Sequence, residues 1–352
     1  MSAHIPDPSS GQPPSRPIRP RLLDELGSPK TPPCAADDFL PLLDNGQNVL
    51  LLGLGPQPEA LPRLLGLPAP QNARVRYVEA PEFAAQLGAA WRAGLPDGFE
   101  AVDAVDADAL FTLARASRVL LYRPGPRLFP GFWGPLLARL RLAFCPSRPT
   151  PAPKLLWLPG GDADLLRLEL REAFEALGWR VRLLPDGQDS SALLAGGECP
   201  ALFLSVNFRG LDALGETAHL LAAAGARVAV WCVDNPLHLL SGLRARFWMD
   251  LPLFVTDDWF IEPLTRLGAK HARHLPLAAR ASDVAGPAHT PPTPPADAAN
   301  AANAAAFTDL ADRLVFVGRS AFPEKAGFFA GCTVPAAART EAARRMEVFG
   351  RS

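Results

Sequence analysis

Segments typical of strands and helices alternate regularly from Lys154 to about residue 280. The strand-like segments are short and apolar, and they read KLLWLPGG, WRVRLLP, PALFLSVNFRG, RVAVWCVDNP, LPLFVTDD and HARHLPLAA. The clearest helix, DADLLRLELREAFEALGW, carries its leucines mostly on one face, with Asp162 or Asp164 at its start and Gly178 at its end. Strands that alternate with helices predict a parallel sheet with right-handed crossovers.

Polar side chains stand at the ends of three of these predicted strands. Asn207 ends one, Asp234 and Asn235 end VWCVDNP, and Asp257 and Asp258 end LPLFVTDD. Because the carboxyl edge of an open α/β sheet is where ligands bind, we expect Asn207, Asp234, Asn235 and Asp257 to share one cleft. The alternative is that these residues only cap turns and helices, as such residues commonly do.

The histidines of this part of the chain are weaker indications of a functional site. His238 follows the DNP turn and is a candidate general base or a partner for a sugar hydroxyl, although a single histidine at a helix start is more often structural. His271 and His274 flank a predicted strand and lack an acidic partner at the spacing of metal ligands. We therefore predict no metal site.

A glycine turn follows the first predicted strand of the chain. Asn48 to Leu52 form the strand, Gly53 and Gly55 follow it, and the next apolar run ends at Glu79. This is the layout of a Rossmann nucleotide site, where backbone N–H groups meet the ligand and the acid binds ribose hydroxyls. The third glycine is absent and prolines intrude, so the simpler interpretation is that the glycines only tighten a βα turn.

Low-complexity stretches divide the chain. Residues 1 to about 36 are rich in Pro, Ser and Arg, HTPPTPPADAANAANAAA reads as a linker, and CPSRPTPAPK is a shorter break. Boundaries between domains fall in such stretches. We expect a disordered tail over 1–44, a Rossmann-like domain over 45–147, a second over 154–280, a linker over 281–307 and a short segment over 308–352.

Charge and cysteine usage restrict the partners and the compartment. The formal net charge of -1 gives no indication of nucleic acid or an acidic membrane surface as a partner. No apolar run approaches the ~20 residues that span a bilayer, and the N-terminus has no apolar core of a secretory signal. The five scattered cysteines favour reduced, mostly buried thiols in a cytoplasmic protein.

The last segment contains two cations beside a strand-to-helix turn. LVFVG is the predicted strand, Arg319 follows it, and Lys325 comes after a loop that contains proline. Two cations and a helix N-terminus suit a diphosphate, although two solvated surface charges are the simpler alternative.

Three segments, in their order along the chain, resemble the CgeB-like, spore-maturation-type bacterial glycosyltransferases. They are VWCVDNP, LFVTDDWFIEPLTRLGAKHARHLPLA and LVFVGRSAFPEKAGFF, and the resemblance covers about residues 154–345. It implies the GT-B architecture, in which one Rossmann-like domain binds the acceptor and a second binds a nucleotide-sugar donor without a metal or further cofactor. It also implies that Arg319 and Lys325 hold the donor diphosphate, and that the leading domain is an addition ahead of the transferase part.

The second GT-B domain is expected to be incomplete. Only about thirty residues follow Arg319, whereas a Rossmann-type domain needs roughly a hundred. We therefore expect only its first strand and helix, and consider a truncated chain, a binding module, or a partner that supplies the missing donor half.

The leading functional hypothesis is sugar transfer from a nucleotide-sugar to an unknown acceptor. Asp234 or His238 would act as the general base, while cations offset the charge on the leaving diphosphate. Asn207, Asn235 and Asp257 would contact the substrate. The alternatives are a non-catalytic ligand-binding or interaction module of the same fold, and a methyltransferase-like nucleotide site at Gly53, Gly55 and Glu79.

Overall fold

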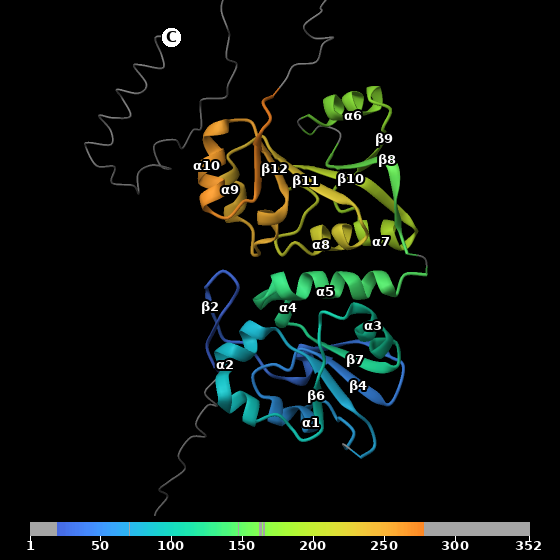
Figure 1. The fold of residues 1–352 in the computed structure, drawn as a ribbon, viewed down its shortest axis with the longest axis vertical. Coiled ribbons are helices and arrows are strands. Elements are labelled where there is room, and N and C mark those ends of the chain that lie inside the picture. The colour runs from blue at the N-terminus through green and yellow to red at the C-terminus, as the bar shows by residue number, and fades with distance from the viewer. Residues whose placement is uncertain (1–19, 70, 147, 162–163, 165, 278–352) are drawn as a thin grey trace, which may run out of the picture. The chain divides into compact units, whose positions relative to one another are not determined.

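Two open sheets with their helices and one short two-stranded sheet make up the described chain (Figure 1). In this computed structural model the described residues are 20–69, 71–146, 148–161, 164 and 166–277. Nearly all neighbouring strands in the two sheets are parallel. The prediction of an α/β protein with two Rossmann-like sheets is therefore confirmed. The linker over 281–307 and the expected start of a third domain lie outside the described residues.

The first sheet has the order β3-β7-β4-β5-β6, with β3 antiparallel to β7 and the other pairs parallel. Its strands are β3 (Phe39–Asp44), β4 (Asn48–Leu52), β5 (Val75–Val78), β6 (Phe99–Ala101) and β7 (Ser117–Tyr122). Its helices and 3-10 turns are η1 (Ala36–Asp38), η2 (Pro58–Ala60), α1 (Leu61–Leu64), α2 (Pro81–Ala93), α3 (Ala107–Arg115), α4 (Gly125–Leu128) and α5 (Pro130–Ala143). The strand order reverses between β4 and β7, which makes this the switch point of the first sheet.

The second sheet is parallel throughout and has the order β9-β8-β10-β11-β12-β13. Its strands are β8 (Thr150–Pro159), β9 (Arg180–Leu184), β10 (Glu198–Val206), β11 (Arg227–Cys232), β12 (Pro252–Val255) and β13 (His271–His274). Its helices and 3-10 turns are α6 (Arg167–Ala176), α7 (Ser190–Ala195), α8 (Glu216–Ala223), α9 (Pro236–Ser241), η3 (Phe247–Asp250), η4 (Asp258–Phe260) and α10 (Ile261–Arg266). Here the order reverses between β8 and β10.

Continuous apolar runs form the central strands because both faces of these strands are covered. Val49 to Leu52 in β4 are at most 2% exposed, and the same holds for Leu155 to Leu158 in β8. Trp133 from α5 is fully buried in the first core, and Trp157 is fully buried in the second. Burial of such aromatic side chains contributes about 1.5–3 kcal/mol each to folding.

The segment that the sequence assigned to a disordered tail forms three strands from residue 22 onward, so that prediction is wrong for this part. β1 (Leu22–Leu23) pairs with β2 (Pro29–Lys30), and β3 joins the first sheet. Leu22 and Phe39 are buried in the first core. The amide of Gln86 on α2 also accepts from the Leu23 N–H at 2.7 Å and donates to its carbonyl at 2.9 Å. The composition of this segment gave no indication of these pairings, buried side chains and hydrogen bonds.

The start of α6 also differs from the prediction. The helix begins at Arg167, after Leu166 in a left-handed conformation, and Asp164 does not cap it. Instead, the Asp164 carboxylate accepts a hydrogen bond from the Gly161 N–H and pairs with Arg209 at 2.5 Å. The other expected cap, Asp162, lies outside the described residues.

Helices α5 and α8 pack against each other, and the first figure shows them side by side (Figure 1). Gly134 of α5 faces the imidazole of His219 on α8 so closely that a Cβ atom at Gly134 would overlap the ring. The carboxylate of Glu25 adds a second link, since it accepts hydrogen bonds from the N–H groups of Gly131 at 2.5 Å and Arg246 at 3.1 Å. The two sheets are thus joined by direct contacts within one compact unit.

Candidate functional site

The carboxyl edge of the second sheet carries the polar residues that the sequence singled out. Asn207 directly follows β10, Asp234 and Asn235 follow β11, and Asp257 follows β12. These three strands are neighbours and parallel, so their carboxyl ends lie at the same edge. The sequence prediction that these loops share one edge agrees with the strand order.

Asn207 joins two of these loops. Its Oδ1 accepts hydrogen bonds from the N–H groups of Val233 at 2.9 Å and Asp234 at 3.2 Å, and its Nδ2 donates to Oδ2 of Asp234 at 2.7 Å. The backbone of Asn207 is left-handed, with φ at 53°, and so is that of Phe208, with φ at 62°. Non-glycine residues held in this region cluster at functional sites, where surrounding contacts maintain them.

The carboxylate of Asp234 is thereby oriented and still accessible. Asp234 is exposed, and within the described residues no hydrogen bond occupies its Oδ1. A carboxylate held through one oxygen can accept a hydrogen bond from a ligand hydroxyl through the other.

Asn235 and Asp257 cap the starts of helices, which is the alternative interpretation of these residues from the sequence. Oδ1 of Asn235 accepts from the Leu237 N–H at 3.0 Å at the start of α9, and Oδ1 of Asp257 accepts from the Trp259 N–H at 3.0 Å at the start of η4. Both side chains are exposed at the edge. Their hydrogen bonds explain their positions without a ligand.

His238 lies on the short helix α9 and is exposed. Its carbonyl accepts a 2.6 Å hydrogen bond from the Ser241 hydroxyl. Among the residues that the structure describes, no hydrogen bond holds its imidazole ring, and none joins it to Asp234. The structure therefore orients Asp234 more firmly than His238.

A cavity of about 280 Å³ lies beside this edge, at the switch point between β8 and β10. Its walls include Pro159, Asp164, Asn207 and Arg209. Arg209 binds Asp186 through two hydrogen bonds of 3.1 and 3.0 Å and also pairs with Asp164. The hydrogen bonds that Arg209 donates to Asp186, followed by the nearby Asp164 charge, raise the pKa of the Arg209 guanidinium. Ligands of open α/β sheets bind at such a switch point.

Sequence reasoning missed Asp164 and Arg209 as members of this site. Asp164 was expected at a helix start, Arg209 follows the predicted strand that ends at Asn207, and nothing in the sequence indicated that these two residues lie together. The usable signal was the strand order, because the first and third strands of a doubly wound sheet are neighbours and leave a crevice between their carboxyl ends.

The glycine turn of the first sheet is filled by protein atoms. Gly53 and Gly55 have φ angles of 90° and 71°, and a Cβ atom at either would lie 2.9–3.1 Å from atoms of Tyr122. Tyr122 is 1% exposed, and its hydroxyl donates a 2.5 Å hydrogen bond to the Pro33 carbonyl. The glycines thus allow close packing of an aromatic ring against the turn.

Glu79 does come together with these glycines, as the sequence suggested. Its carboxylate accepts from the N–H groups of Leu54 at 2.8 Å and Ala80 at 2.9 Å. Desolvation raises the pKa of Glu79 to about 7, against the opposing effect of hydrogen bonds from Leu54, Ala80 and Gly55. The turn N–H groups that a nucleotide phosphate would need are partly taken by Glu79.

Arg319 and Lys325, the expected diphosphate ligands, lie outside the described residues. Within residues 20–277 as described, no cluster of three or more His, Cys, Asp or Glu side chains could hold a metal ion. The four cysteines described there are free; burial raises the pKa of the Cys199 and Cys232 thiols to about 11 and about 12, which leaves them poor nucleophiles.

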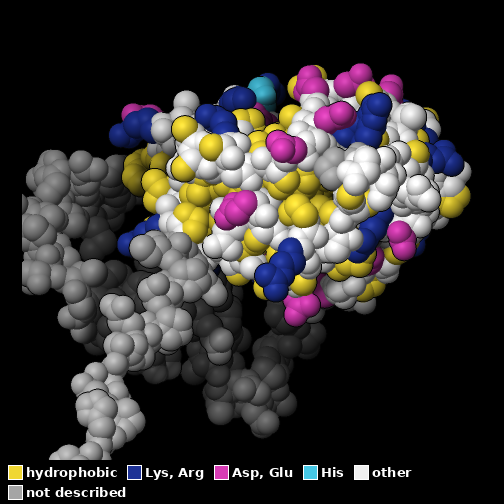
Figure 2. Space-filling model, turned by 90° about the horizontal axis from the view of Figure 1, so that it is seen from below, with side chains coloured by type: hydrophobic (Ala, Val, Ile, Leu, Met, Phe, Trp, Pro, Cys, Tyr) yellow, Lys and Arg dark blue, Asp and Glu magenta, His cyan; other side chains and the backbone are white. Residues whose placement is uncertain are grey.

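Neither the described helices nor the face seen in Figure 2 indicates a bilayer-spanning segment or a patch of one charge sign. None of the described helices combines the length and apolarity needed to cross a membrane. On the face seen in Figure 2, acidic and basic side chains are interspersed among apolar ones. This pattern fits the near-zero net charge of the sequence.

Comparison with known proteins adds one weak similarity. No protein-family model and no curated protein matches the chain. Among solved structures, the chain is similar to a MAf glycosyltransferase from Magnetospirillum magneticum AMB-1, at 15% sequence identity and a TM-score of 0.15. The similarity covers 63% of this chain and 42% of that protein, so the chain spans less than half of its length. At this TM-score the similarity says nothing about the activity of the chain.

Proposed function

We propose that this chain is a glycosyltransferase-like protein of the GT-B type and that the carboxyl edge of its second sheet binds the sugar acceptor. The observation that carries the proposal is the exposed carboxylate of Asp234, which is oriented by Asn207, a residue that lines the cavity at the β8–β10 switch point. Both residues belong to the part of the chain that resembles the CgeB-like glycosyltransferases.

In this proposal Asp234 is the general base. The acceptor hydroxyl gives its proton to Oδ1 of Asp234 while its oxygen forms a bond to the anomeric carbon of the donor sugar. The bond from that carbon to the diphosphate breaks, and the diphosphate leaves with the electron pair. Arg319 and Lys325 offset the charge on the leaving diphosphate. His238 contributes to acceptor binding at the same edge.

A binding experiment tests the ligand class. UDP is titrated into the purified chain and into an Arg319→Ala, Lys325→Ala double variant by calorimetry. We expect weak binding by the wild type, because two charge-assisted contacts of roughly 1.5–3 kcal/mol each cannot overcome the ordering and association costs alone. The double variant should not bind UDP. Equal binding by both proteins would place the nucleotide elsewhere.

An activity experiment tests the role of Asp234. The chain is incubated with a panel of nucleotide-sugars and simple glycoside acceptors, and release of the free nucleotide is followed. Asp234→Asn keeps the size of the side chain and removes its basicity, so it should lower acceptor-dependent release by about 10²-fold or more. Asp258→Asn serves as the matched control at the same edge. Unchanged release by Asp234→Asn would exclude this residue as the base.

A non-catalytic ligand-binding or interaction module of the same fold is the second candidate. The observation that favours it is that Asn235 and Asp257 are already engaged as caps, so fewer side chains are committed to a substrate. In that case the wild type would bind a ligand without acceptor-dependent release of nucleotide. The packing of Tyr122 against Gly53 and Gly55 gives the methyltransferase-like alternative less support.

A further inference from the structure

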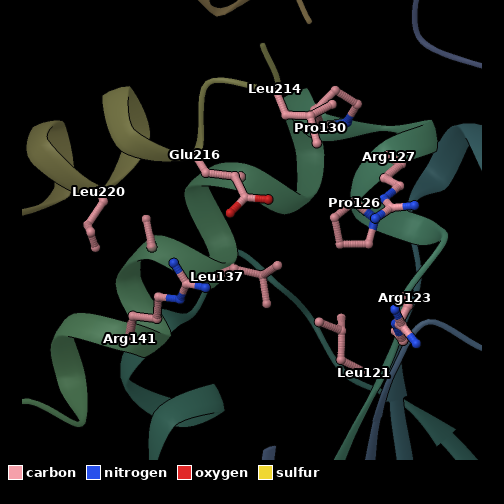
Figure 3. Close-up of a pocket in the computed structure, with 12 residues that line it drawn as sticks. Leu121, Arg123, Pro126, Arg127, Pro130, Leu137, Arg141, Leu214, Glu216 and Leu220 are labelled. Atoms are coloured by element: carbon pink, nitrogen blue, oxygen red, sulfur yellow. The ribbon is translucent and has the colours of Figure 1, made fainter. Parts of the chain in front are cut away.

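Three arginines surround a pocket that lies between α4, α5 and the start of α8. Arg123, Arg127 and Arg141 line it together with Glu216, and the cavity measures about 200 Å³ (Figure 3). Leu121, Leu137 and Leu220 supply apolar parts of the lining, as the close-up shows. The pocket is distinct from the edge that carries Asn207 and Asp234, since it shares no lining residue with the β8–β10 cavity.

The fold fixes the cations from three separate elements. Arg123 directly follows β7 at the switch point of the first sheet, and its N–H donates a 2.8 Å hydrogen bond to the Asp38 carbonyl. Arg127 belongs to α4. Arg141 lies on the face of α5 that also presents Gly134 and Leu137, because residues three, four and seven positions apart share one helix face.

The three arginine side chains are exposed, and none of them forms an ion pair with a described residue. Arg209, by contrast, pairs with two carboxylates. Asp189 lies near Arg141. Its carboxylate accepts a 2.6 Å hydrogen bond from the hydroxyl of Ser191. Three cations with one lining carboxylate, Glu216, leave the pocket with an excess of positive charge.

The N-terminal N–H groups of α8 are not available for the ligand. The Asp212 carboxylate accepts from the N–H groups of Leu214, Glu216 and Thr217 at 2.8–3.1 Å. A ligand in the pocket therefore has to be recognised by side chains. Arginine suits oxyanions such as phosphate and carboxylate, because its planar group binds two oxygens at once.

We propose that this pocket binds a small phosphate ester that also carries hydroxyl groups, with the phosphate on Arg123, Arg127 and Arg141 and a hydroxyl donating to Glu216. A dianionic phosphate matches three guanidinium groups and one carboxylate, whereas a single carboxylate would leave positive charge uncompensated. The apolar side chains cover the carbon skeleton of the ligand. This site does not depend on the proposed sugar transfer at the second sheet.

The experiment measures binding of inorganic phosphate and of ribose 5-phosphate to the full chain at constant ionic strength, by calorimetry and by ³¹P NMR. The wild type should bind both saturably at millimolar concentration, ribose 5-phosphate more tightly. Arg123→Ala and Arg141→Ala should each weaken binding by at least about tenfold, because a charge-assisted hydrogen bond exceeds the ~1.4 kcal/mol that equals tenfold. Arg63→Ala, which removes an exposed arginine from α1, should bind like the wild type.

Replacing the carboxylate of Glu216 should change the affinity for inorganic phosphate in the opposite direction. Glu216→Gln removes the one negative charge and should bind inorganic phosphate several-fold more tightly, while losing the preference for ribose 5-phosphate. This variant guards against loss of binding through misfolding, since a misfolded chain would not bind more tightly. Equal binding by wild type, Arg123→Ala and Arg141→Ala would overturn the proposal, and so would the absence of saturable binding by the wild type.

Discussion

The side-chain amide of Asn207 donates a 2.7 Å hydrogen bond to the carboxylate of Asp234, 27 positions further along the chain. The same side chain accepts from the N–H groups of Val233 and Asp234. One residue therefore ties the loop after β10 to the loop after β11. Because both loops stand at the carboxyl edge of the sheet, this link decides how Asp234 is presented to a ligand.

Replacing Asn207 should remove the link between the two loops and lower the free energy of unfolding. Asn207→Ala removes three hydrogen bonds of about 1 kcal/mol each and puts alanine in a left-handed conformation that costs roughly 1–2 kcal/mol. Since the site is half-exposed and water replaces part of the loss, we expect about 2–3 kcal/mol less stability in urea unfolding. Asn207→Gly loses the same hydrogen bonds without the backbone strain and should be the more stable of the two. An alanine variant as stable as the wild type would show that the link is unimportant.

Glu79 should make the protein less stable as the pH rises. Its folded-state pKa is raised to about 7, first by desolvation, from an ordinary value of 4.5. Between these two values the folded state binds more protons than the unfolded state, so the free energy of unfolding falls as pH increases through this window. Each unit of pKa difference corresponds to ~1.4 kcal/mol, which gives up to about 3 kcal/mol for this residue.

The measurement for Glu79 is urea unfolding at a series of pH values across that window. Glu79→Gln mimics the protonated acid, so the variant should show a flatter pH dependence than the wild type. Glu82→Gln, on the exposed face of α2, removes a carboxylate without this burial and should leave the dependence unchanged. The same slope in wild type and Glu79→Gln would refute the assignment.

His219 should produce a pH dependence of the opposite sign. Desolvation lowers the pKa of its imidazole, against the opposing charges of Asp212, Glu25 and Asp250, and its Nε2 has no hydrogen-bond partner among the described residues. The unfolded state therefore binds a proton more readily, and stability is lost as pH falls through the ordinary histidine value of about 6.5 and below. His219→Leu should remove this acid-side loss in urea unfolding, whereas His271→Leu, at the exposed start of β13, should retain it.

The central strands of the second sheet could be predicted from the sequence because most of their side chains are buried. Arg227–Cys232 and Pro252–Val255 read as continuous apolar runs, as parallel strands do, and each is followed by a polar turn. Strands that alternate with helices then place all their carboxyl ends at one edge. This explains why Asn207, Asp234 and Asp257 could be grouped without a structure.

What the sequence could not reveal depends on contacts between distant residues. β3 is an edge strand that reads FLPLLD, with mostly exposed side chains and Pro41 inside it. Proline within an apolar run argues against a central strand, so the run alone does not predict this one. Its place is set by antiparallel pairing with β7, far along the chain. The arginine pocket likewise joins three elements, and no spacing in the sequence brings Arg123 to Glu216.

The contact between Gly134 and His219 allows a test of how α5 and α8 pack. In an ordinary helix interior, replacing glycine by alanine stabilises by up to about 1 kcal/mol. Here the new methyl group would overlap the imidazole ring of His219, which is packed in turn at 6.5 Å from the Phe247 ring centre. Gly134→Ala should therefore destabilise the protein, by about 1–3 kcal/mol, as overpacking of a core does.

A double-mutant cycle separates the effect of this overlap from the effect of the higher helix propensity of alanine. His219→Ala removes the ring, so adding Gly134→Ala in that background should raise the free energy of unfolding by up to about 1 kcal/mol. The sign of the alanine effect should thus reverse between the two backgrounds, measured by urea unfolding at neutral pH, where the imidazole is uncharged. Gly131→Ala offers a contrast on the same helix, because its Cβ would meet the carboxylate at the end of the Glu25 side chain rather than an imidazole ring. If Gly134→Ala had the same effect with and without the imidazole, α5 and α8 would not be in contact through these two residues.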